Sequence, residues 1–112
     1  MFKVVAQGTV RFFTHDVKVL IPSDGGHVEE QLKTKFVYLQ SDELKEFDLG
    51  TIAGTDMFLD KTVMTFLDLA DDDGQPIACT PEIRERLLRD PNVRLALSAH
   101  YFAAVTKVPE GN

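Results

Sequence analysis

Two helix starts, each marked by a proline, lie within residues 71–105 of this chain of 112 residues. Thr80 precedes Pro81, and Asp90 precedes Pro91. A residue before proline is driven out of the α region, which an N-cap requires in any case, and a proline at the first helical position loses no intrahelical hydrogen bond. The pattern therefore predicts helices that begin at Pro81 and at Pro91. The same segment contains no recognisable catalytic constellation.

The composition of the chain changes near Gln40. β-branched residues in two-residue alternation come before it, and helical spacings come after it. Strands followed by helices favour an α+β fold. We predict one domain over residues 1–108, with strands within about 3–39 and helices within about 41–107, and a frayed tail at 109–112.

Three strands are expected in the N-terminal part. Alternation of apolar and polar residues predicts strands over 4–12, 17–21 and about 28–39, with a turn at 14–16 between the first two. The sequence Asp24-Gly25-Gly26 allows the positive φ angles that a tight hairpin turn needs. The expected sheet is therefore an N-terminal three-stranded antiparallel β-meander.

Strict alternation leaves a second set of apolar residues on the other face of the predicted meander: Val5, Phe13, Leu20, Val37 and Leu39. Either the helices cover part of this face, or another subunit or a partner does. We take these five residues as the candidates for partner binding or for an oligomer interface.

About four helices are expected to pack on the meander. The first has Ser41 as its N-cap and is short, because Gly50 and Gly54 follow. The second runs over about 56–69 and ends at the acidic turn 71–74, where a glycine permits a left-handed conformation. The two helices that begin with proline complete the set.

The acidic turn does not fit a calcium loop. If Gly74 took position six of an EF-hand loop, Leu69 would take position one and Thr80 position twelve. Leucine has no side-chain oxygen, and threonine cannot supply the bidentate carboxylate of position twelve. A solvated turn is the better interpretation.

Other candidate chemistry is equally sparse. His15, His27 and His100 do not have the i, i+4 spacing of a helical zinc motif. Cys79 is a candidate nucleophile only if a histidine lies beside it in space. The sequence contains no glycine-rich phosphate motif. We therefore predict no catalytic residue, no metal ligand and no cofactor.

Charge and hydropathy narrow the range of partners. The formal net charge of −6 argues against a nucleic-acid binder that works through phosphate contacts. The apolar runs are too short to span a bilayer, and the first residues lack the apolar core of a signal peptide. A single cysteine fits a reducing compartment. We expect a cytoplasmic protein that binds neither nucleic acid nor membrane.

Several motifs occur together in this chain: an acidic glycine turn, a Thr-Pro-Glu helix start, a Pro-Asn-Val-Arg stretch and a tyrosine in the last helix. In combination they resemble the tail assembly chaperones of long-tailed (siphovirus-type) bacteriophages. The residues that carry the resemblance are 71–76, 80–82, 89–97 and 101–104, with Ile21-Pro22, the Asp-Gly-Gly hairpin and 33–36 in the N-terminal part. Many relatives have a tryptophan shortly before the acidic turn, where this chain has Phe66 and no tryptophan anywhere.

The resemblance implies a phage or prophage protein that is not an enzyme. Such a chaperone binds the tape measure protein, keeps it soluble and helps the tail tube protein to polymerise. The resemblance also implies a homo-oligomer in the bacterial host cytoplasm. The alternative is a structural tail or head–tail connector protein, which stays in the virion.

Overall fold

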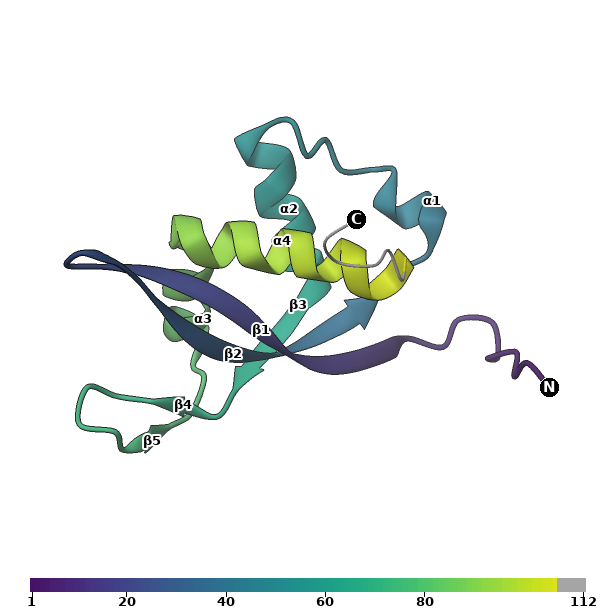
Figure 1. The fold of residues 1–112 in the computed structure, drawn as a ribbon. Coiled ribbons are helices and arrows are strands. Elements are labelled where there is room, and N and C mark those ends of the chain that lie inside the picture. Colours follow the sequence, from purple (N-terminus) through teal and green to yellow (C-terminus); the bar gives the residue numbers. More distant parts are fainter. Residues whose placement is uncertain (107–112) are drawn as a thin grey trace.

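The computed structural model describes residues 1–106, which have an α+β fold with a three-stranded and a two-stranded antiparallel sheet and four helices (Figure 1). The elements in chain order are β1 Arg11–Ser23, β2 Gly26–Tyr38, α1 Ser41–Leu44, α2 Ile52–Thr62, β3 Val63–Leu67, β4 Leu69–Ala70, β5 Pro76–Ile77, α3 Pro81–Arg89 and α4 Pro91–Thr106. The predicted fold class is confirmed. The tail predicted at 109–112 lies outside the described residues.

The hairpin predicted at Asp24-Gly25-Gly26 is confirmed. Ser23 pairs with Gly26, so the loop between β1 and β2 has two residues, and Gly25 has a φ of +82°. The turn predicted at 14–16 is wrong, because the ladder between the two strands continues without a break through His15 to Arg11. β1 is therefore one strand of 13 residues in place of two short ones.

The strand predicted over about 28–39 is present as β2, whereas the strand predicted over 4–12 is absent up to residue 10 and the sheet takes its remaining strand, β3, from a later part of the chain. The sheet order is β1-β2-β3, and residues 1–10 belong to no strand. β3 occupies a stretch expected to be the end of a helix over 56–69. It pairs antiparallel with β2, and it buries Val63 and Phe66, each 1% exposed. The meander of three consecutive strands is thus replaced by a hairpin and a later strand.

The early end of α2 coincides with contacts from α3. Arg84 of α3 donates from Nη2 to the carbonyl oxygens of Asp60, at 2.9 Å, and Val63, at 2.7 Å. A cation that binds carbonyls at a helix C-terminus satisfies acceptors that lack intrahelical partners. β-branched Thr62 and Val63 also suit a strand better than a helix. These contacts involve residues distant in sequence, so the spacing of apolar residues did not indicate them.

The acidic turn also has a different place from the one predicted. It joins β4 to β5 and does not end a helix. The Asp71 carboxylate accepts from the backbone N–H groups of Asp73, at 3.0 Å, and Gln75, at 2.9 Å. Gly74 has a φ of +78°. The turn is a short hairpin held by an aspartate side chain.

Both helix starts predicted from proline are confirmed. The Thr80 hydroxyl accepts from Ile83 N at 3.2 Å, and the Asp90 carboxylate accepts from Val93 N at 3.2 Å. The start of α1 differs by one residue, because its N-cap is Gln40 and not Ser41. There the Glu43 carboxylate accepts from the Gln40 backbone N–H at 3.2 Å.

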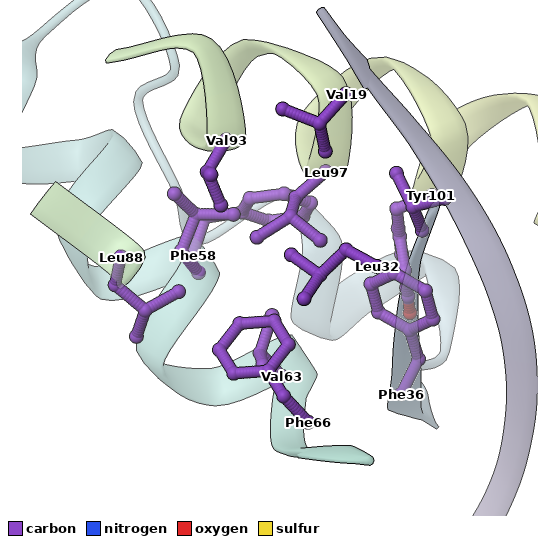
Figure 2. Packing of buried hydrophobic residues seen from close by; sticks show 12 residues of the cluster. Val19, Leu32, Phe36, Phe58, Val63, Phe66, Leu88, Val93, Leu97 and Tyr101 are labelled. Atoms are coloured by element: carbon purple, nitrogen blue, oxygen red, sulfur yellow. The ribbon is translucent and has the colours of Figure 1, made fainter. Parts of the chain in front are cut away.

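The core lies between one face of the sheet and the helices (Figure 2). α4 packs mainly against β1, and α2 packs against β2 and β3. The buried side chains are Val17, Val19, Leu32, Phe36, Phe58, Leu59, Val63, Phe66, Leu88, Val93, Leu97 and Tyr101. Every α-helix except the one-turn α1 contributes side chains to this cluster. The helices therefore cover one face of the sheet and leave its other face exposed.

Candidate interaction surface

Residues 1–10 form an N-terminal arm that projects from the body of the protein (Figure 1). Its apolar side chains are open to solvent: Phe2 is 90% exposed, Val4 89% and Val10 60%. A turn bends the arm where Thr9 N donates to Ala6 O at 3.1 Å. A type II turn requires a positive φ at its third position, and Gly8 takes that position with a φ of +84°. The arm thus presents apolar surface that the body does not cover.

A groove of about 950 Å³ lies between the arm and the body, and we call it the arm groove. One wall is the arm itself with the start of β1. The other wall includes residues 37–41 at the end of β2 and just after it, Glu43 and Leu44 of α1, and the end of α4, with Lys61 and Met64. Glu43 and Lys61 bring charges of both signs to the lining. The lining is mixed, with apolar side chains such as Phe2 and Val37 beside polar and charged ones. A groove with both kinds of side chain can hold an amphipathic helix.

Tyr101 holds the inner wall of the arm groove in place. Its hydroxyl oxygen accepts from Leu39 N at 3.0 Å, and its hydroxyl group donates to Val37 O at 2.8 Å. The Tyr101 side chain is fully buried, and this desolvation raises its pKa above the ordinary value of 10.0. Tyr101 is therefore neutral at physiological pH and ties the end of β2 to α4. In the sequence, Tyr101 is the tyrosine of the last helix, one of the motifs of the resemblance, and nothing there indicates its two hydrogen bonds.

Three of the five candidate interface residues meet at the arm groove. Val5, Val37 and Leu39 all line it, although Leu39 is only 5% exposed. Leu20 lies elsewhere, on the open face of the sheet, and is 53% exposed. The structure thus brings Val5 and Val37 together as accessible groove residues and separates Leu20 from them.

Phe13 is on the opposite face from the one predicted. It pairs with Phe36 across β1 and β2, and the two rings stack with centroids 5.1 Å apart. It also lies 5.8 Å from the Tyr101 ring. The expected break at 14–16 had put Phe13 and Val17 in separate strands, whereas continuous alternation in β1 places both on the core face.

One pair of histidines comes together in the fold. His15 Nδ1 of β1 and His100 Nε2 of α4 are 2.9 Å apart, so one ring donates and the other accepts. Within residues 1–106 no group of three or more His, Cys, Asp or Glu side chains is arranged to hold a metal ion. The pair links α4 to the sheet.

Cys79 is half-buried beside a cavity of about 250 Å³. Its sulfur lies 3.8 Å from Thr80 O. The cavity lining includes Arg84 and Glu85 but no histidine. The condition that the sequence sets for a nucleophilic cysteine, a neighbouring histidine, is not met among the residues of this lining.

In the described part of the chain, no helix has both the length and the apolar character needed to cross a bilayer. The chain matches no family model, no curated protein and no solved structure. The arm, the arm groove and the sequence motifs are therefore the features from which a function can be inferred.

Proposed function

We propose that this protein is a tail assembly chaperone of a long-tailed bacteriophage or prophage. It binds the tape measure protein in the host cytoplasm and keeps that long chain soluble while the tail tube protein polymerises. The observation that carries the proposal is the exposed apolar arm beside the arm groove, on a small domain with a formal net charge of −6. The sequence motifs shared with this chaperone family give it its specific form.

The surface has the properties that such a chaperone needs. A long helical chain aggregates unless its apolar stripe is covered. Phe2 and Val4 stand on the exposed arm, and Val37 stands on the facing wall of the groove. A helix laid between them is covered from two sides. The acidic remainder of the surface keeps the complex soluble through its net charge.

Co-expression tests the proposal. This chain is produced together with the tape measure protein of the same phage or prophage, which the proposal takes to be a long helical protein encoded just downstream. The lysate is then separated into soluble and insoluble fractions. We expect the helical protein to be insoluble alone and to co-purify with this chain when both are present. A helical protein that stays in the pellet under both conditions would contradict the chaperone function.

The virion distinguishes the chaperone from the structural alternative. A chaperone is released before the tail is complete, so this chain is expected to be absent from purified mature particles. Mass spectrometry of such particles measures this directly. Stoichiometric amounts of the chain in the virion would favour a structural tail or head–tail connector protein.

A further inference from the structure

β1 is a long strand at the edge of the sheet, with β2 on one side of it. Ser23 and Gly26 close the two-residue hairpin, so the residues of β1 that exchange hydrogen bonds with β2 are the odd-numbered ones. The even-numbered residues direct their backbone N–H and C=O groups away from β2. The residues that offer both an N–H and a C=O on this outer side are Phe12, Thr14, Asp16, Lys18 and Leu20. Only Pro22, near the end of the strand, lacks a donor.

Within residues 1–106, no other strand pairs with this edge. α4 reaches β1 through side chains of the core face: Phe13 packs against Tyr101, and His15 is hydrogen-bonded to His100. These contacts run between side chains and use none of the outward backbone groups of β1.

Proteins usually protect an edge by making it short or bulged, by covering it, or by placing proline and charged residues on it. β1 is long, its ladder with β2 has no register shift, and the two charged residues near its middle, Asp16 and Lys18, are of opposite sign. Such an edge is a template for a strand that carries complementary charges.

We propose that the partner strand is β1 of a second copy of this chain, paired antiparallel about a twofold axis that passes through Val17. In this register Arg11 lies opposite Ser23, so all 13 residues of each strand overlap. Asp16 lies opposite Lys18 of the second copy, and the symmetry repeats the pair. Both side chains are exposed on the open face of the sheet.

Charge selects this register over its neighbours. Outward hydrogen bonds require even-numbered residues to face each other, so the register can slip only in steps of two residues. One step sets Asp16 against Asp16, and the step in the other direction sets Lys18 against Lys18. Opposite charges across two strands stabilise the pair, and like charges destabilise it. The register with full overlap is therefore also the one with two complementary ion pairs.

The dimer has one continuous six-stranded sheet and two arm grooves. Because Arg11 of one copy lies beside Ser23 of the other, the arms leave the sheet at opposite ends. The pairing gives the homo-oligomer of the proposed chaperone a definite surface and symmetry. It does not depend on the identity of the bound partner, because apart from Arg11 and Phe12, which also line the arm groove, the residues of β1 lie outside that groove.

Sedimentation equilibrium of the full-length chain tests the pairing. We expect the wild-type mass to be twice the monomer mass of 12.5 kDa at micromolar concentration. Asp16→Lys and Lys18→Asp each create two like-charge pairs, so each variant alone should have a dimer dissociation constant at least about tenfold higher. Asp72→Lys makes the same charge change in the exposed acidic turn, and it should leave the dimer intact.

Mixing the two weakened variants gives the sharper result. In a mixed dimer, the lysines at positions 16 and 18 of the Asp16→Lys chain face the aspartates at positions 18 and 16 of the Lys18→Asp chain. Association should therefore return. The double variant Asp16→Lys/Lys18→Asp should also dimerise as the wild type does. Thr14→Pro removes an outward N–H from the edge and spares the ladder with β2, so it should weaken the dimer.

Several outcomes would overturn the pairing: a monomeric wild type, single variants with unchanged dissociation constants, or a mixture that fails to associate. The co-expression experiment is separate. A monomeric chain that still solubilises the helical protein refutes the β1 pairing and leaves the chaperone function standing. A charge-dependent dimer that does not bind the helical protein supports the β1 pairing and refutes the chaperone function.

Discussion

At the scale of single residues, Tyr101 connects the last helix to the end of β2. One hydroxyl group serves two backbone groups, the N–H of Leu39 and the carbonyl of Val37, in a position closed to solvent. Buried backbone groups that lose their partners cost more free energy than the net gain from a typical hydrogen bond. Tyr101 therefore contributes to stability and to the shape of the arm groove at once.

Tyr101→Phe should lower the free energy of unfolding by about 1–3 kcal/mol while the protein stays folded, because it removes both hydrogen bonds and little apolar contact. Urea denaturation followed by circular dichroism measures this. Tyr38→Phe is the matched control, since Tyr38 is 41% exposed, and it should change stability by less than about 0.5 kcal/mol. Equal effects of the two substitutions would refute the bridging role.

The pKa of Tyr101 predicts a dependence of stability on alkaline pH. Burial raises the pKa of the folded state above 10.0, so the folded protein holds the proton more tightly than the unfolded chain. This stabilisation is complete below the unfolded pKa and is lost as the pH rises through the folded pKa. Urea midpoints at alkaline pH should therefore fall more steeply for the wild type than for Tyr101→Phe. Parallel curves would contradict the assignment.

At the scale of elements, β3 decides whether the sheet has three strands. It lies directly after α2, and it buries Val63 and Phe66 against β2 and the helices. Arg84 fixes the junction between α2 and β3 by binding carbonyls at the end of the helix. Strand, helix end and α3 therefore form one interdependent unit.

Phe66→Asp should unfold the protein or cost at least about 4 kcal/mol, because it buries a charge that has no partner. The neighbouring substitution Leu67→Asp provides the control, since Leu67 is 39% exposed and pairs with Lys33. A thermal melt of each variant measures the difference. If Phe66→Asp melts with the wild type, Phe66 is not a core residue.

The elements that the sequence predicted well are those with local causes. The hairpin at Asp24-Gly25 depends on the positive φ of Gly25, and the starts of α3 and α4 depend on cap side chains within three residues of the backbone that they hold. The elements that were predicted wrongly depend on contacts between residues that are far apart in the sequence. β3 needs β2, and the continuity of β1 through His15 needs Thr34 as a partner. Hydrophobic periodicity cannot indicate either contact, since both form only in the tertiary structure.

The candidate site was predicted in part for the same reason. The apolar character of Val5 and Val37 is visible in the sequence, and both line the arm groove. The place of Phe13 depends on the unbroken register of β1, and the role of Tyr101 depends on a contact 62 residues away, with Leu39. A groove between a terminal arm and the body exists only once these contacts have formed.

At the scale of the whole molecule, our two proposals give different surfaces different tasks. The core face of the sheet holds the helices. In the proposals, the outer edge of β1 meets a second copy and the arm groove binds the helical partner. The proposed dimer places the two grooves at opposite ends of the sheet. A bivalent chaperone can hold two segments of one long chain, which raises its apparent affinity without any new contact.

The most direct measurement is a co-purification of the downstream helical protein with an arm variant of this chain. Phe2→Asp/Val4→Asp changes two side chains that are 90% and 89% exposed, so folding should be unaffected. Leu95→Asp is the control, because Leu95 is 72% exposed on α4 and does not line the arm groove. We predict that the helical protein returns to the pellet with the arm variant and stays soluble with the control. Equal soluble recovery with both variants and the wild type would contradict binding at the arm groove.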